Sequence, residues 1–319
     1  MIAVPRRARR LHPVIGVLAA VALQLAIGAG GAGAQTSSEA PRSPLPEGYA
    51  GADACRECHK RAFSTLEATK MGRLFLKHPR TAQERLGCET CHGPGKVHAE
   101  SNGEKPGDLI SFAGNDRTAV EKRNRVCLAC HERGAHILWK GSAHDSREIG
   151  CTACHTVMTS VSPSSQLRKS TEIETCGTCH RERRAQQMRS SHMPLREGKM
   201  TCSSCHSPHG TVARALLKEL SVNDTCYVCH AEKRGPFLWE HAPVTESCVT
   251  CHDPHGSNRE RLLKVSMPRL CQQCHVERSH PSMPHGRGSD PKFVMGRSCA
   301  SCHVNIHGSN HPSGFRFTR

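Results

Sequence analysis

The chain has 319 residues, a formal net charge of +16, 20 cysteines, 23 histidines and only 11 aromatic residues, namely seven Phe, two Trp and two Tyr. This composition argues against a conventional globular core, because a soluble chain of this length normally buries many aromatic and branched side chains. We therefore expect another apolar component to fill the interior, and the polypeptide without it to be largely unfolded.

Residues 1–34 have the features of a secretory signal peptide. Four arginines at positions 6, 7, 9 and 10 precede an apolar stretch at 14–27, and Ala32-Gly33-Ala34 is an Ala-x-Ala cleavage site before Gln35. The apolar stretch of about 14 residues is shorter than the roughly 20 of a membrane span, which favours cleavage over a retained anchor. Cleavage leaves residues 35–319 with a formal charge of +12, because the leader holds four arginines and no acidic residue.

All twenty cysteines lie in ten Cys-x-x-Cys-His motifs. In one helical turn, cysteines at i and i+3 share a face and can each form a thioether with a haem vinyl group, while the histidine at i+4 can ligate the iron. Zinc would not require the histidine after every pair, and cysteines within one turn are poor disulfide partners. The sequence therefore predicts ten covalently bound haems of the c type.

The residues of this prediction are as follows. The attachment cysteines are Cys55, Cys58, Cys88, Cys91, Cys127, Cys130, Cys151, Cys154, Cys176, Cys179, Cys202, Cys205, Cys226, Cys229, Cys248, Cys251, Cys271, Cys274, Cys299 and Cys302. The proximal iron ligands are His59, His92, His131, His155, His180, His206, His230, His252, His275 and His303.

The motifs come in pairs, which predicts five two-haem repeats starting near residues 55, 127, 176, 226 and 271. A lone histidine lies between the two motifs of each repeat, and another follows the second motif in every repeat but the second, where HTVM replaces HSPH. These positions predict distal ligands for predominantly bis-histidine irons. The candidates are His78, His98, His136, His144, His192, His209, His241, His255, His285 and His307. His280 is the alternative to His285, and Met158, which would raise the potential of its haem, is the alternative to His136.

The predicted fold is mostly α with extensive coil and little or no β structure, wrapped around the haems. Short helices are expected at 116–131, 213–220 and 258–275, and Pro- and Gly-rich loops at 194–198 and 280–291. Trp139 and Trp239 occupy corresponding positions in two repeats, and we expect their rings to pack against haem.

These motifs and linkers resemble the MtrA/DmsE/PioA family of periplasmic decahaem cytochromes. The resemblance covers nearly all of the mature chain, from GADACRECH through CETCHGPGKVH, WKGSAH before CTACH, CSSCHSPHG and CHDPHG to CASCHVNIHGSNHPSGF. It implies two pentahaem halves, meeting here near 181–200, and a place inside an outer-membrane β-barrel porin. It also implies electron transfer between a periplasmic or inner-membrane quinol-linked cytochrome and an extracellular multihaem cytochrome or terminal reductase.

We accordingly expect a periplasmic electron carrier, associated with the outer membrane, rather than an enzyme. All ten motifs end in histidine, and an iron with two protein ligands has no position for a substrate. The alternatives are a multihaem reductase with one open haem and a soluble periplasmic electron store. The positive charge does not indicate a nucleic-acid partner, because ten haems bring about 20 propionate charges. The terminal partner, the direction of flow, the individual potentials and the pairing of distal histidines with irons are left open.

Overall fold

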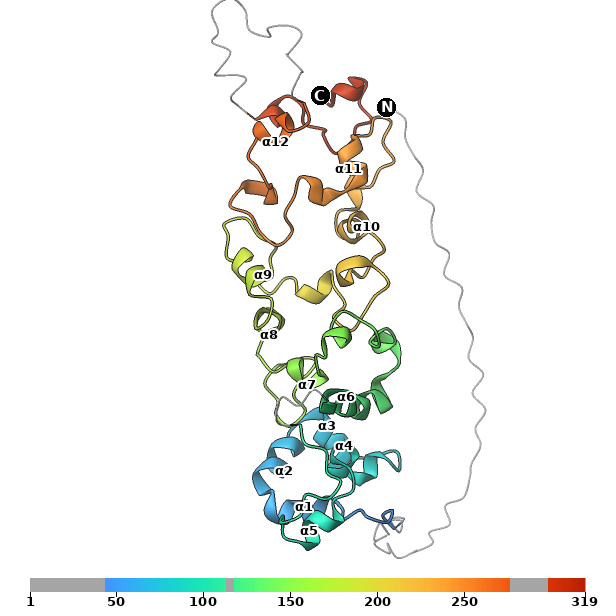
Figure 1. Ribbon diagram of the computed structural model, residues 1–319. Helices are drawn as coiled ribbons and strands as arrows, with labels where there is room; N and C mark the ends of the chain where they lie inside the picture. Colours follow the sequence, from blue (N-terminus) through green and yellow to red (C-terminus); the bar gives the residue numbers. More distant parts are fainter. Residues whose placement is uncertain (1–43, 113–117, 276–297, 319) are drawn as a thin grey trace, which may run out of the picture. The chain divides into compact units, whose positions relative to one another are not determined.

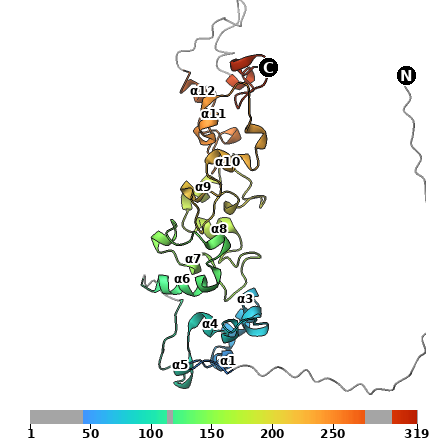
Figure 2. The ribbon, with the colours of Figure 1, turned by 90° about the vertical axis from the view of Figure 1, so that its right-hand side faces the viewer.

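The computed structural model describes residues 44–112, 118–275 and 298–318 (Figure 1). From Leu45 onward these residues belong to one compact body. Within the described ranges the chain forms short helices joined by coil and contains no β-strand, only five isolated bridges. Figure 2 shows the same helices and coil from the side. The expectation of a mostly helical and coil fold is confirmed.

The α-helices are α1 (Ala52–Cys58), α2 (Lys60–Glu67), α3 (Lys70–Gly72), α4 (Glu89–His92), α5 (Lys96–Glu100), α6 (Thr118–His131), α7 (Cys151–Cys154), α8 (Glu172–Gly177), α9 (Arg181–Gln186), α10 (Val222–Tyr227), α11 (Ala242–Glu246) and α12 (Arg269–Gln272). A π-helix forms η1 (Arg73–Lys77). The 3₁₀ turns are η2 (Glu84–Leu86), η3 (Gly134–His136), η4 (Asp145–Arg147), η5 (Cys202–Ser204), η6 (Arg214–Leu216), η7 (Ala231–Lys233), η8 (Cys248–Thr250), η9 (Glu260–Leu262), η10 (Cys299–Ser301) and η11 (Gly314–Arg316).

The Cys-x-x-Cys-His motifs adopt the helical turn that their spacing requires. In the nine motifs outside α6, the histidine N–H donates to the carbonyl of the first cysteine at 2.9–3.1 Å. The remaining motif, at 127–131, forms the last turn of α6, the longest described helix with 14 residues. Caps start two of the other motif helices: Thr171 makes a capping box with Glu174 at α8, and the Ser221 side chain accepts from the Asp224 N–H at α10.

Two of the predicted helices are wrong. The chain at 213–220 forms only the short turn η6, because Ala215 and Leu216 both have left-handed φ of 56°. The stretch 258–275 divides into η9 and α12, because Arg261 and Leu262 are likewise left-handed and Pro268 cannot continue a helix. The helix predicted at 116–131 is confirmed over Thr118–His131. Residues 194–198 form turns as predicted, whereas the loop predicted at 280–291 lies outside the described residues.

Hydrogen bonds from buried asparagines hold the two motifs of a repeat together. Asn124, three residues before Cys127, accepts from the Cys151 N–H at 2.9 Å. Asn223, three residues before Cys226, accepts from the Cys248 N–H at 2.7 Å. Both side chains are buried, so an unpaired amide there would be destabilising. Each bond fixes the start of a second motif against the helix that carries the first.

In the first repeat a buried carboxylate of the second motif joins the two motifs instead. Glu89, which is 2% exposed, accepts from the backbone N–H groups of Ala50, Gly51 and Gly95 at 2.9, 2.8 and 2.7 Å. Gly51 is the residue before α1, so the carboxylate of the second motif anchors the helix of the first.

The polypeptide buries little apolar surface of its own. Among the described residues, the buried hydrophobic side chains are Leu66, Phe75, Leu86 and Trp139. Large apolar side chains elsewhere are highly exposed, including Val212 at 79% and Leu220 at 80%. The core expected from the composition therefore has to come from another apolar group. Within the described part of the chain, no helix has the length and apolar character to cross a membrane.

Candidate functional site

The first cysteines of the two motifs in each repeat lie side by side. Their thiols form the hydrogen-bonded or closely approaching pairs Cys55–Cys88, Cys127–Cys151, Cys176–Cys202, Cys226–Cys248 and Cys271–Cys299. The bond from Cys151 lowers the pKa of Cys127 to about 7, while the same bond, together with burial, raises the pKa of Cys151. Two attachment sites therefore meet inside every repeat.

Neighbouring repeats meet through cysteines of adjacent motifs. Burial raises the pKa of Cys91 to about 11, and the nearby thiols of Cys127 and Cys130 add to the rise. The corresponding neighbours in the later repeats are Cys154 and Cys179, Cys205 and Cys229, and Cys251 and Cys274. Contacts within and between repeats thus alternate, and all ten motifs form one continuous series in chain order.

Five motif histidines face another histidine in a nearly parallel arrangement. The ring centroids are 6.2 Å apart in His59–His98, His241–His275 and His252–His307, 6.1 Å in His206–His255, and 6.0 Å in His155–His209, with interplanar angles of 15–22°. Two imidazole nitrogens about 2 Å from one metal ion, with the radius of each ring added, give a centroid separation of about 6 Å. The spacing fits one iron between each pair.

Two further pairs have the same spacing but steeper ring angles. His131 lies 6.0 Å from His136 at 61°, and His144 lies 6.2 Å from His180 at 65°. Seven of the ten candidate distal histidines therefore stand opposite a motif histidine. His192 instead bonds through Nε2 to Glu197 at 3.1 Å, which raises the pKa of His192. His78 has no such ring partner among the described residues, and His280 and His285 lie outside them.

In five of the seven pairs the facing histidines come from different repeats, which the sequence pattern did not reveal. The pairs His59–His98 and His131–His136 each lie within one repeat. His144 and His241, each between the two motifs of its repeat, face the first motif of the following repeat at His180 and His275. His209, His255 and His307, which follow a second motif, each face the second motif of the preceding repeat. A metal ion held by one of these five pairs would need the two neighbouring repeats to be docked.

A glycine directly after the histidine makes this docking possible. A Cβ atom on Gly210 would lie 2.0 Å from the Leu138 carbonyl oxygen, and one on Gly256 would lie 2.1 Å from the Gln186 carbonyl oxygen. Gly308 approaches the Phe237 ring equally closely. The repeated His-Gly dipeptide is the feature of the sequence that indicates this close approach, because only glycine lets two backbones come so close.

Burial keeps several distal candidates in the form that binds metals. It lowers the pKa of His209 to about 4, with His136 and His155 contributing, and it also lowers the pKa values of His255 and His307. Neutral imidazole is the metal-ligating form. The donor set therefore consists of paired thiols and neutral imidazoles, which suits a covalently attached haem with two axial histidines.

A buried donor without a protein partner also fits haem. Trp139 is 7% exposed, its Nε1–H has no acceptor among the described residues, and its ring lies 6.2 Å from that of His209. A buried N–H group normally has a partner. A haem propionate next to the His155–His209 pair would provide an acceptor.

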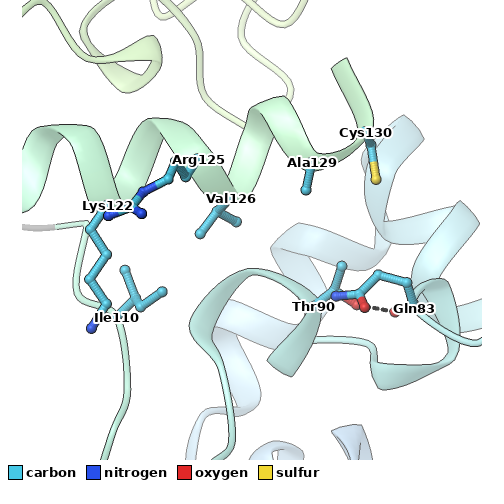
Figure 3. A pocket seen from close by; sticks show the side chains of 8 residues that line it. All are labelled: Gln83, Thr90, Ile110, Lys122, Arg125, Val126, Ala129 and Cys130. Atoms are coloured by element: carbon cyan, nitrogen blue, oxygen red, sulfur yellow. Dashed lines mark hydrogen bonds between the residues drawn. The ribbon is translucent and has the colours of Figure 1, made fainter. Parts of the chain in front are cut away.

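A pocket of about 440 Å³ opens beside the third motif (Figure 3). Figure 3 shows Val126 and Ala129 of α6 on the face that looks toward Gln83 and Thr90, next to Cys130. Lys122 and Arg125 also line the pocket. The apolar walls suit a flat apolar group, the two cations suit its carboxylates, and the attachment cysteine could hold it covalently.

Comparisons with known proteins agree with this donor set. A family model described as "Doubled CXXCH motif" matches residues 192–235 and 241–280, and one described as "Cytochrome c-type protein NrfB-like" matches residues 88–179. The multiheme cytochrome MtrA of Shewanella baltica (strain OS185) is 45% identical over 271 residues, which cover 83% of this chain and 80% of that protein.

Proposed function

Because the chain belongs to the family of MtrA-like multihaem c-type cytochromes, we propose that it holds ten haems and carries electrons across the outer membrane within a porin. The family membership confirms the resemblance stated from the motifs and the general role in haem-based electron transport. The number of haems, the distal ligands and the porin are the proposal.

Each attachment site has a defined set of residues in this proposal. The twenty motif cysteines hold the porphyrins and the ten motif histidines bind the irons on one side. Bound haem supplies the one-electron couple of its iron. The ring pairs support seven distal ligands: His98, His136, His144, His209, His241, His255 and His307.

The repeat pattern supports a ligand for one of the remaining three irons, and elimination leaves candidates for the other two. His192 corresponds in position to His144 and His241, so we assign it to His230, the first motif of the next repeat. His78 then remains for His92, and His285 or His280 for His303. Because His131 faces His136, the assignment prefers His136 to Met158.

The observation that carries the electron-carrier role is the set of seven histidine pairs with centroids 6.0–6.2 Å apart. An imidazole on each side leaves no axial position for nitrite, hydroxylamine or a sulfur oxyanion. The arrangement therefore supports an electron carrier over a reductase. The unbroken series of cysteine neighbours supports conduction along the whole chain.

The partners follow from this role. A periplasmic or inner-membrane quinol-linked cytochrome would exchange electrons at one end, and an extracellular multihaem cytochrome or terminal reductase at the other, with a β-barrel porin around the chain. The signal peptide at 1–34 would direct the chain to the periplasm, where it would associate with the outer membrane. The potentials of the partners would set the direction of flow.

Two measurements test the proposal. Detergent extraction of outer membranes should recover the tagged holoprotein together with a β-barrel protein, whereas recovery only in the soluble periplasmic fraction would support a soluble electron store. Electron paramagnetic resonance of the oxidised holoprotein should contain only low-spin ferric signals. A high-spin signal equal to one full haem would support the reductase with an open iron.

A further inference from the structure

In the second motif of each repeat, Nδ1 of the proximal histidine is hydrogen-bonded to a backbone carbonyl oxygen. Nδ1 of His155 lies 2.7 Å from the Ser165 oxygen, that of His206 2.8 Å from Ala215, and that of His252 2.7 Å from Arg261. The same contact joins His92 to Ile110 at 3.0 Å and His303 to Arg316 at 2.5 Å. With Nδ1–H donating to a carbonyl, Nε2 keeps its lone pair for a metal.

In three repeats the carbonyl belongs to a pair of left-handed residues. The pairs are Ser165–Gln166 with φ of 53° and 47°, Ala215–Leu216 with 56° at both, and Arg261–Leu262 with 57° and 59°. None of the six is glycine. A left-handed conformation is sterically unfavourable for such a residue, because its Cβ atom comes too close to the following carbonyl oxygen. Backbone strain of this kind persists where the surroundings impose it, commonly at functional sites.

Hydrogen bonds on both sides of the turn impose this conformation. In the third repeat, the Ser207 N–H donates to the Leu216 carbonyl at 2.8 Å and the Lys218 N–H donates to the Cys205 carbonyl at 2.9 Å. The second and fourth repeats have the equivalent bonds, which are Thr156 to Gln166, Arg168 to Cys154, Asp253 to Leu262 and Lys264 to Cys251. The turn is therefore tied to the motif on either side of its histidine.

The first motifs lack this arrangement. Among the described residues, no hydrogen bond to a carbonyl is found for the rings of His59, His131, His180 or His275, and His230 has Glu232 at 3.6 Å instead. The two motifs of a repeat therefore differ in whether the imidazole of the proximal histidine is hydrogen-bonded to a backbone carbonyl. This difference recurs through the chain.

We propose that the paired left-handed turns at 165–166, 215–216 and 261–262 are positioning elements that fix the proximal imidazoles of His155, His206 and His252 and lower the reduction potentials of their irons. The inference rests on the haem ligation of the proposed function. A carbonyl that accepts from Nδ1–H makes the imidazole a more basic ligand. A more basic ligand favours ferric iron, so the hydrogen bond lowers the potential.

Proline substitution at Ala215 tests the turn. Proline requires a φ near −65°, so Ala215→Pro cannot keep the φ of 56° and must move the carbonyl away from His206. Ala213→Pro is the matched control, because Ala213 has a φ of −85° that proline accepts. Ala215→Gly is the conservative variant, because glycine adopts left-handed φ without strain.

The readout is a spectroelectrochemical titration of each holoprotein, with haem content measured beside it. In Ala215→Pro, one tenth of the haem absorbance change should move to higher potential, while Ala213→Pro and Ala215→Gly should titrate like the wild type. Ten attached haems with an unshifted titration in Ala215→Pro would overturn the inference and leave the proposed function standing. Absence of haem from the wild type would overturn the proposed function itself.

Two further measurements apply if Ala215→Pro does not yield holoprotein. Arg261→Pro places the same change in the next repeat and should shift one haem, that of His252. Nuclear magnetic resonance of the reduced wild type with ¹⁵N-labelled histidine should contain five proximal ring N–H protons shifted downfield by the carbonyl. Equivalent shifts for the ring protons of all ten proximal histidines would overturn the inference.

Discussion

Gly256→Ala should open one specific iron. Gly256 has a φ of 128°, and a Cβ atom there would lie 2.1 Å from the Gln186 carbonyl oxygen. Ordinary Cβ contacts begin at 3.4 Å, so the two backbones must separate by about 1.3 Å to accept the methyl group. A metal–imidazole bond of about 2 Å cannot follow such a displacement. His255, the adjacent residue, should therefore lose its position opposite His206.

The stability should fall as well. The unfavourable φ costs about 1–3 kcal/mol, and overpacking adds about 1–3 kcal/mol. We expect a loss of about 2–6 kcal/mol in the free energy of unfolding. Gly141→Ala is the matched control, because Gly141 also has a left-handed φ, 78°, but no atom within 4 Å of its added Cβ.

Electron paramagnetic resonance and thermal unfolding of the two holoproteins provide the assay. Gly256→Ala should show a high-spin ferric signal equivalent to one haem, and Gly141→Ala should remain low-spin. Identical spectra and melting temperatures for the two variants would refute the role of close backbone approach in delivering His255.

Three further changes test the bonds that join the motifs. Glu89→Ala leaves three backbone N–H groups without their carboxylate, and should lower the free energy of unfolding by about 3 kcal/mol or more in denaturant titrations. Asn223→Ala removes the acceptor of the Cys248 N–H and should cost about 2 kcal/mol, with reduced haem attachment at that motif by peptide mass spectrometry. Thr171→Ala breaks the capping box with Glu174 and should cost about 1 kcal/mol by the same titration.

Glu219→Gln is the control for these three variants, because Glu219 is exposed and belongs to none of the hydrogen bonds described. It should unfold like the wild type. A Glu89→Ala protein as stable as Glu219→Gln would contradict the anchoring of α1 by the buried carboxylate.

Local chemistry made part of the site predictable. The motif spacing alone fixes a single helical turn, and the structure has that turn in every described motif. The helix ending at His131 was predictable for the same reason. Composition predicted the scarcity of a polypeptide core, which leaves Leu66, Phe75, Leu86 and Trp139 as the buried apolar residues of the described chain.

The partners in five of the seven histidine pairs were not predictable, because they depend on how separate repeats dock. His144 lies 36 positions before His180, and no local pattern relates the two. The helix predicted at 213–220 failed because hydrogen bonds to Cys205 and Ser207 outweigh the helical preference of the segment. Asn124 and Asn223 were visible three residues before a motif, but their role depends on a second motif more than 20 residues away.

The proposed bis-histidine ligation of all ten irons is tested most directly by near-infrared magnetic circular dichroism of the oxidised holoprotein, normalised to protein concentration. The account predicts a single bis-histidine charge-transfer band with the intensity of ten low-spin irons. A band of histidine–methionine ligation, or a high-spin band with the intensity of one haem, would contradict it.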